Sequence, residues 1–98
     1  MARFDYYLGA RNKGYLLDCQ SDFLDEFETR VVVPLLPSAG LVAASRLNPV
    51  FVIAGEPYVM STQLIFAIPV ERLGEREGSL RQEHYTIMTA LDTLISDY

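Results

Sequence analysis

The chain has 98 residues, of which 50% are hydrophobic and 21% are charged. This length predicts one globular domain over residues 1–98, since chains of this size bury roughly two thirds of their unfolded surface. Eight basic and thirteen acidic side chains give a formal net charge of −5, which argues against direct nucleic-acid binding through phosphates. No apolar run approaches the ~18 residues of a membrane span, and the N-terminus lacks a secretory signal pattern. We therefore expect no membrane contact and a cytoplasmic location.

Short segments rich in β-branched and aromatic residues, separated by turn residues, predict a mostly β first part of the chain. The expected strands are 3–8, 14–19, 29–36, 49–54, 58–63 and 65–71. Turn residues at 9–13 and at Gly55-Glu56 indicate antiparallel neighbours. The strands that contain Pro34 and Pro69 are expected to bend or to lie at an edge, because proline lacks a backbone donor. Residues 37–48 predict either a short helix or an ordered loop.

The end of the chain predicts a helix. Ser79 followed by Gln82 is a capping-box pattern, which places the helix start there. Beyond it, apolar or packing residues recur every three or four positions and predict one stripe along about five helical turns. They are Leu80, His84, Ile87, Met88, Leu91, Leu94, Ile95 and Tyr98. A small barrel covers only part of such a stripe, so we expect a partner surface.

Residues typical of an active site are scarce. His84 is the only histidine and falls on the apolar stripe, where a packed imidazole is expected more often than a general base. Cys19 is the only cysteine and is expected to be a small buried residue. The acidic residues of segment 18–28 lack the spacing of a calcium loop and predict a solvated rim. We therefore expect no enzyme, no catalytic residue, no metal and no cofactor.

The segment QSDFLDEF at 20–27 places large apolar residues between acids. Phe23 and Leu24, flanked by Asp22 and Asp25, have the pattern of a binding hot spot with a polar rim. Alternatively, these two side chains plug one end of the barrel. The sequence leaves both interpretations open.

Several short motifs follow one another along the chain. They are Asp18-x-Gln20-Ser21-Asp22 followed by two apolar residues and Asp25, the segment 29–35 (TRVVVPL), Asn48-Pro49-Val50, the region of Met60, and Ile68-Pro69-Val70. Together with a helix running to the last residue, this order resembles the CcdB family of toxins from toxin–antitoxin pairs. The resemblance implies a small SH3-like (CcdB/MazF-like) β-barrel with a small extra sheet and a long C-terminal helix, paired as a homodimer.

The resemblance also implies a function and its residues. Family members bind the A subunit of DNA gyrase and trap its cleaved-DNA complex, and the disordered tail of a cognate CcdA-like antitoxin neutralises them. On this basis, gyrase binding is expected at Phe23, Leu24, Asp92, Ser96, Asp97 and Tyr98. The dimer interface is expected at Met88, Leu91, Leu94 and Ile95.

The C-terminus departs from the family pattern. The chain ends Ile95-Ser96-Asp97-Tyr98, whereas well-known CcdB toxins end in a Gly-Ile pair. One alternative is therefore a CcdB-like protein that binds antitoxin but no longer poisons gyrase. Another is a MazF-like endoribonuclease toxin with a similar barrel, although the acidic composition disfavours the cationic groove that RNA requires.

Overall fold

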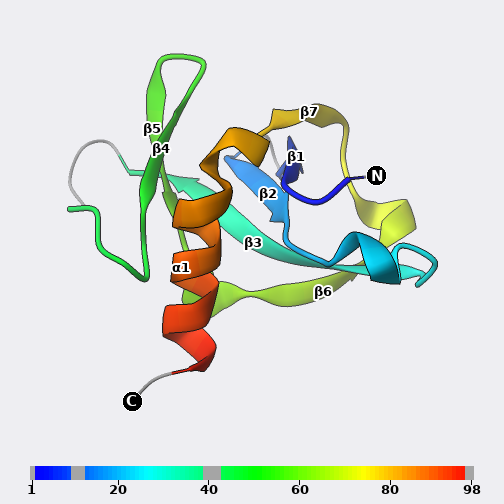
Figure 1. Cartoon of the computed structure of the whole chain (residues 1–98). Helices are drawn as coiled ribbons and strands as arrows, with labels where there is room; N and C mark the ends of the chain where they lie inside the picture. Colours follow the sequence, from blue (N-terminus) through cyan, green and yellow to red (C-terminus); the bar gives the residue numbers. More distant parts are fainter. Residues whose placement is uncertain (1, 10–12, 39–42, 97–98) are drawn as a thin grey trace.

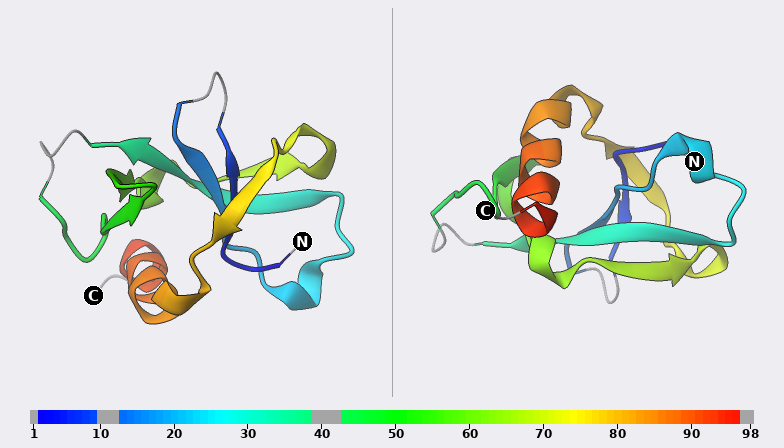
Figure 2. Two further views of the ribbon diagram at one scale, coloured as in Figure 1. Left: turned by 90° about the horizontal axis from the view of Figure 1, so that it is seen from above. Right: turned by 60° about the horizontal axis from the view of Figure 1, so that its bottom comes forward.

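A computed structural model describes residues 2–9, 13–38 and 43–96. Within these ranges the chain forms a curled antiparallel sheet of seven strands and a C-terminal helix, α1 (His84–Ile95), which packs against the sheet (Figures 1 and 2). The arrangement is a small β-barrel that is closed on one side by the helix. None of the helices among the described residues is long and apolar enough to cross a membrane.

The strands follow the order β4-β5-β3-β2-β1-β7, and β6 pairs with β3 beside this path. Their bounds are β1 (Asp5–Leu8), β2 (Tyr15–Asp18), β3 (Thr29–Pro37), β4 (Val50–Ile53), β5 (Glu56–Met60), β6 (Phe66–Pro69) and β7 (Arg76–Ser79). The β4–β5 hairpin projects from the rest of the sheet (Figure 1). Single 3₁₀ turns connect the elements: η2 (Asp22–Leu24), η3 (Thr62–Leu64), η4 (Val70–Arg72) and η5 (Arg81–Glu83).

The longest strand, β3, organises the sheet because it pairs with β2, β5 and β6. Its first residues, up to Val32, pair with β6, and its last residues, from Leu35, pair with β5. Pro34 lies in the gap between these two partners, and its carbonyl accepts from the Ser61 amide at 2.9 Å. The missing amide of proline therefore leaves no ladder position unpaired. Pro69, as predicted, lies at the end of a strand that pairs on one side only.

The six predicted strands are confirmed to within a few residues, but β7 was not predicted. Its sequence is polar, and its position depends on β1. Arg76 contacts both carboxylate oxygens of the buried Asp5, at 3.0 and 3.2 Å, and Ser79 pairs with Asp5 in the sheet register. A strand held by a partner about seventy residues away leaves no periodic signal of its own.

The predicted helix start at Ser79 is also wrong, because Ser79 belongs to this distant strand pairing. Because Ser79 is the last residue of β7, its backbone is extended. Its hydroxyl accepts from the Arg81 amide at 3.1 Å, but the chain then makes the 3₁₀ turn η5, and α1 begins only at His84. The helix has 12 residues, or about three turns, rather than five. Between strands β3 and β4, residues 43–48 form a loop without helix, and 39–42 lie outside the described residues.

The core lies between the concave side of the sheet and α1. Its fully buried members come from both layers and are Leu17, Val33, Leu35, Met60, Ile87 and Ala90. Cys19 belongs to this cluster, 7% exposed, directly after β2, as predicted. Burial, with a smaller contribution from Asp18, raises the pKa of the Cys19 thiol to about 12.

The buried thiol gives a simple test of this core. At pH 8 roughly one Cys19 side chain in ten thousand is ionised when the pKa is about 12, and only the thiolate reacts. We expect the native protein to resist 5,5′-dithiobis(2-nitrobenzoic acid) at pH 8, and the urea-unfolded chain to release one equivalent of thionitrobenzoate. Labelling of the native protein as fast as that of the unfolded chain would contradict this packing.

Candidate functional site

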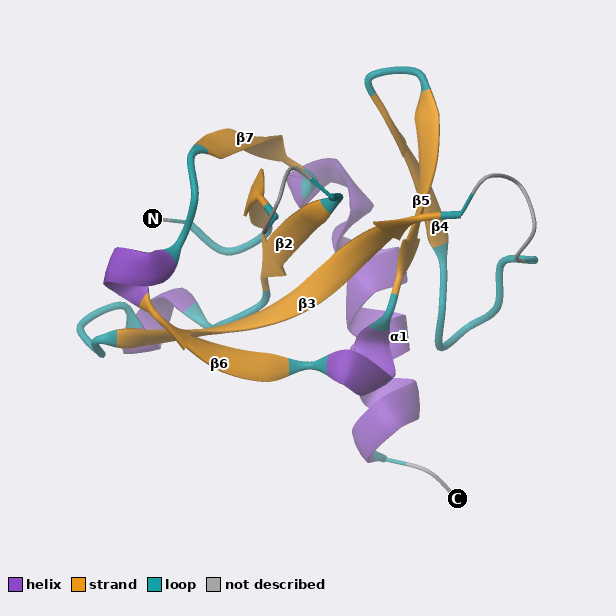
Figure 3. Cartoon of the chain, turned by 180° about the vertical axis from the view of Figure 1, so that it is seen from behind, coloured by secondary structure: helices purple, strands orange, loops and turns teal. Residues whose placement is uncertain are grey.

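The turn between β2 and β3, residues 20–28, carries the most exposed aromatic side chain described. Phe23 is 98% exposed, Leu24 is 44% exposed and Phe27 is 59% exposed. The interpretation of Phe23 and Leu24 as a plug of the barrel is therefore wrong, because both side chains of η2 are exposed. The turn precedes β3 at one end of the sheet (Figure 3). We call this segment the 20–28 turn.

Polar side chains hold this turn in shape. Gln20, 6% exposed, accepts from the Val31 amide at 3.0 Å and donates to the Leu24 carbonyl. Ser21 accepts from the Phe23 amide at 3.2 Å and so caps η2. The turn therefore keeps its conformation without burying its apolar side chains, which remain free to contact another molecule.

A fully buried ion pair lies beneath the turn. Asp18 at the end of β2 and Arg30 at the start of β3 both have 0% exposed side chains. Arg30 Nε donates to Asp18 Oδ2 at 2.9 Å, and Nη2 lies 2.7 Å from the same oxygen. The Gln20 amide donates to Asp18 Oδ1 at 3.1 Å. Burial raises the pKa of Asp18, although the hydrogen bonds from Arg30 and Gln20 oppose the shift.

The N-terminal segment connects the turn to the helix. Asp22 accepts from the Arg3 amide at 2.9 Å, and Arg3 Nη2 lies 3.3 Å from the sulfur of Met88 in α1. The Arg3 guanidinium also lies 5.0 Å from the centroid of the Phe4 ring, within cation–π range. Arg3 therefore bridges the 20–28 turn and α1.

An acidic groove accompanies the turn. It has a volume of about 590 Å³ and lies between the turn and η4. Exposed carboxylates of Asp25, Glu26, Glu28 and Glu71 line it beside Phe27. Within the described part of the chain, no three His, Cys, Asp or Glu side chains are grouped so as to hold a metal ion. The groove instead presents negative charge next to apolar surface.

A second apolar surface lies around the far end of β6. Leu64 in η3 is 53% exposed, Phe66 in β6 is 41% exposed, and Ile95 at the end of α1 is 74% exposed. The helix packs against η3, and β6 runs from this place toward the 20–28 turn (Figure 1). We call Leu64, Phe66 and Ile95 the β6 surface. Leu64, Phe66 and Phe27 were not singled out in the sequence. Leu64 and Phe66 lie in the apolar run 64–70, where residue type does not separate exposed side chains from buried ones.

The predicted interaction residues fall in different surroundings. Asp92 and Ser96 are exposed near the end of α1, and Asp97 and Tyr98 lie outside the described residues. Within one chain, the end of α1 and the 20–28 turn are separated by the length of β6 (Figures 1 and 3). The described members of the predicted gyrase-binding set therefore fall into two separate places on a single chain.

The helix stripe divides between the chain's own core and its surface. Ile87 is fully buried and Leu91 is 8% exposed, so almost no surface of Leu91 is left for a second chain. Met88 and Leu94 are half-buried, and Ile95 is exposed. His84, expected to be packed, is exposed and meets the Phe4 ring edge-on at 5.4 Å.

Comparison with protein-family models identifies a family. A protein-family model described as "CcdB protein" matches residues 3–97 of the chain. The matched range contains the 20–28 turn, the ion pair beneath it and α1, so the match does not depend on a single motif. The comparison with curated proteins found no match.

Removing the arginine of the buried pair tests what holds the turn. Arg30→Met leaves the Asp18 carboxylate buried without its cation, and we expect the free energy of unfolding at pH 7 to fall by about 3–5 kcal/mol. The pKa of Asp18, already raised in the folded state, rises further. Its contribution to stability is therefore complete below the unfolded pKa of about 4 and is lost as the pH rises through the folded pKa.

Urea titrations at pH 5 and pH 8 measure this effect. The loss of stability of the variant, relative to the unsubstituted protein at the same pH, should be smaller at pH 5 than at pH 8. The double variant Asp18→Asn with Arg30→Met is the control, because it removes the carboxylate and should recover part of the loss. Two results would contradict the expected role of the buried ion pair: equal losses of stability at both pH values, or a loss below about 1 kcal/mol.

Proposed function

The chain belongs to the CcdB family of toxins from toxin–antitoxin systems, and on this premise we propose that it binds the A subunit of DNA gyrase in the cytoplasm. Binding would trap the cleaved-DNA complex, and a cognate CcdA-like antitoxin would neutralise the toxin. The observation that carries the proposal is Phe23, 98% exposed on a turn whose shape is set by buried polar contacts. A large apolar side chain held in solvent is typical of an interface anchor.

The proposed action is binding without catalysis. Covering Phe23 stabilises a complex by about 1.5–3 kcal/mol before ordering costs. Those costs are small for a turn that is already fixed by Gln20 and Ser21, because preorganised segments lose little conformational freedom on binding. A gyrase conformation that exposes the complementary pocket would thereby be held in place, and religation of the cleaved DNA would be prevented.

Charge supports a basic partner surface at the same place. The groove beside Phe27 is lined by four carboxylates, and the whole chain has a formal charge of −5. Such a field favours association with lysine- or arginine-bearing surfaces and selects against acidic ones. We propose that gyrase and the basic or apolar tail of the antitoxin compete for the 20–28 turn and its groove.

The β6 surface is the proposed dimer interface. Leu64, Phe66 and Ile95 are each exposed, and the outer edge of β6 has no partner strand within the described residues. Pairing two chains through this surface would cover it, with half-buried Leu94 and Met88 nearby. A twofold dimer carries two 20–28 turns and meets the twofold gyrase A pair with each contact doubled.

One sequence observation favours a second candidate. The ending Ser96-Asp97-Tyr98 places a carboxylate where well-known members have glycine, and a carboxylate buried without a partner is costly. The alternative is a protein that binds antitoxin without poisoning gyrase. The MazF-like alternative is weaker, because Arg30, the arginine of the TRVVVPL motif, is fully buried and unavailable to an RNA groove.

Replacing the anchor tests the proposal. Phe23→Asp should weaken binding of purified gyrase A by at least tenfold, because it removes the apolar anchor and adds a charge. Its melting temperature should stay unchanged, since the side chain is exposed. Tyr85→Asp is the matched control: Tyr85 is 82% exposed but lies on α1 away from the turn, and this variant should bind normally.

Growth tests complete this experiment. Induction of the unsubstituted protein in a gyrase-dependent bacterium should stop growth and accumulate cleaved DNA–gyrase complexes, and Phe23→Asp should not. Antitoxin binding without gyrase binding would instead support the second candidate. Loss of folding in Phe23→Asp would show that Phe23 has a structural role that its exposure does not reveal.

The proposed dimer is tested by Ile95→Asp and Leu64→Asp. Each places a carboxylate in the β6 surface, and we expect the sedimentation coefficient to change from that of a dimer to that of a monomer. Val52→Asp, at an exposed valine of β4, is the control and should stay dimeric. A monomeric unsubstituted protein at micromolar concentration contradicts the proposed interface.

A further inference from the structure

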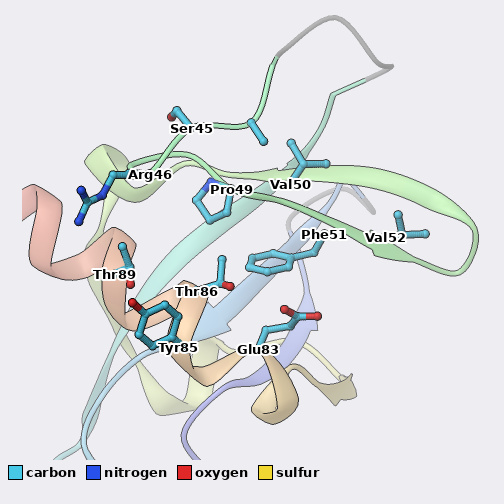
Figure 4. Close-up of a pocket in the computed structure, with 11 residues that line it drawn as sticks. Ser45, Arg46, Pro49, Val50, Phe51, Val52, Glu83, Tyr85, Thr86 and Thr89 are labelled. Atoms are coloured by element: carbon cyan, nitrogen blue, oxygen red, sulfur yellow. The ribbon is translucent and has the colours of Figure 1, made fainter.

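A separate cleft lies between the β4–β5 hairpin and the outer face of α1. It has a volume of about 810 Å³ and is lined by residues of β4, of the loop before it, of α1 and of η5, which contributes Glu83. Val52 and Tyr85, two of its lining residues, are 70% and 82% exposed. Figure 4 shows Phe51 and Tyr85 in the middle of this cleft. The cleft shares no lining residue with the groove beside the 20–28 turn.

The strand that borders this cleft has an unpaired edge. Among the described residues, β4 is the terminal strand of the sheet path and pairs with β5 alone. The Pro49 carbonyl accepts from the Met60 amide at 2.9 Å, and hydrogen-bonded pairs alternate along antiparallel strands. Phe51 and Ile53 therefore pair with β5, whereas the backbone groups of Val50 and Val52 point toward the free edge. Pro57 stands opposite Val52, where no donor to β4 is required.

We propose that the free edge of β4 binds an extended peptide segment as an added antiparallel strand. Backbone hydrogen bonds to Val50 and Val52 would hold the segment, and its alternate apolar side chains would enter the cleft toward Phe51 and Tyr85. Antiparallel addition is the more stable arrangement at a free edge. This inference concerns a surface other than the one in the proposed function and does not depend on it.

The charged residues at the two ends of the cleft predict which end residues the bound segment should carry. Arg46 and Glu83 lie at different ends of the cleft (Figure 4), and β4 runs from the Arg46 end toward the Glu83 end. An antiparallel segment therefore begins near Glu83 and ends near Arg46, so it should carry a basic residue first and an acidic residue last. A second copy of this chain fits less well, because it brings its own α1 beside its β4 and that helix needs the same space.

Two synthetic peptides test the proposal. The first is the blocked heptapeptide lysine-valine-threonine-phenylalanine-threonine-valine-glutamate, and the second exchanges its two end residues. Titration into ¹⁵N-labelled protein should shift the amide signals of Val50, Val52 and Tyr85. The exchanged peptide should bind more weakly, by about threefold or more, because both exposed charge pairs become repulsive. The proposal is overturned if neither peptide binds.

Backbone methylation separates an added strand from other occupants. One form of the first peptide carries N-methyl groups on its valines and phenylalanine, and another carries them on its threonines. Only one of the two sets of amides can face β4, so one form should bind at least tenfold more weakly and the other should be unaffected. Equal binding of both forms indicates a non-strand occupant and overturns the proposal.

Variants of the protein give the reciprocal test. Val52→Pro removes the outward amide but not the pairing of Phe51 and Ile53 with β5, so it should abolish peptide binding. Val52→Thr keeps the backbone and is the matched control. The methylated peptides decide the question where Val52→Pro fails to fold. The amide signals of Val50 and Val52 are also measured at several protein concentrations without peptide. If they change with concentration, a second copy binds the edge, and the proposal is overturned.

Discussion

The buried ion pair between Asp18 and Arg30 determines how the most exposed part of this molecule is built. Both side chains are fully buried, and they join the last residue of β2 to the second residue of β3. The segment between them is thereby closed into a short loop with fixed ends. Burying two charges is costly unless they are paired and hydrogen-bonded, so any rearrangement that separates these two side chains is unfavourable. The position of the 20–28 turn follows from this pairing.

The turn reverses the usual distribution of side chains. Gln20 in the turn and Asp18 just before it are buried and make the structural contacts, whereas Phe23 and Phe27 are exposed. Exposed apolar side chains give a folding chain no stability, so their conformation must be set by something else. Here the buried hydrogen bonds set it. A partner that covers Phe23 therefore meets a surface that is already formed, and little of the binding free energy is lost in ordering it.

The sequence predicted the elements whose pattern is local and failed where pairing is distant. Alternation and turn residues located six strands, and the motif around Gln20 correctly marked an unusual turn. The polar strand β7 and the true start of α1 depend on the contact of Asp5 with Arg76 and Ser79, which no local pattern records. Periodicity also identified the apolar stripe of α1 without separating Leu91, which the core covers, from Ile95, which is exposed among the described residues. Neither the buried state of Arg30 nor the cleft beside β4 follows from residue types alone.

Strand β3 connects the 20–28 turn with the β4–β5 hairpin. It begins at Thr29, next to the 20–28 turn, pairs with β6 along its first residues, and ends at Pro37, where it pairs with β5 of the projecting hairpin. Its nine residues span about 30 Å at 3.3 Å per residue, so the 20–28 turn and the hairpin lie at opposite ends of one long strand. Any effect of one on the other has to pass through β3 or through Arg3, which bridges the turn and α1. Since β3 is hydrogen-bonded along both sides over much of its length, it holds these surfaces at a fixed spacing, and the two binding events are expected to be nearly independent.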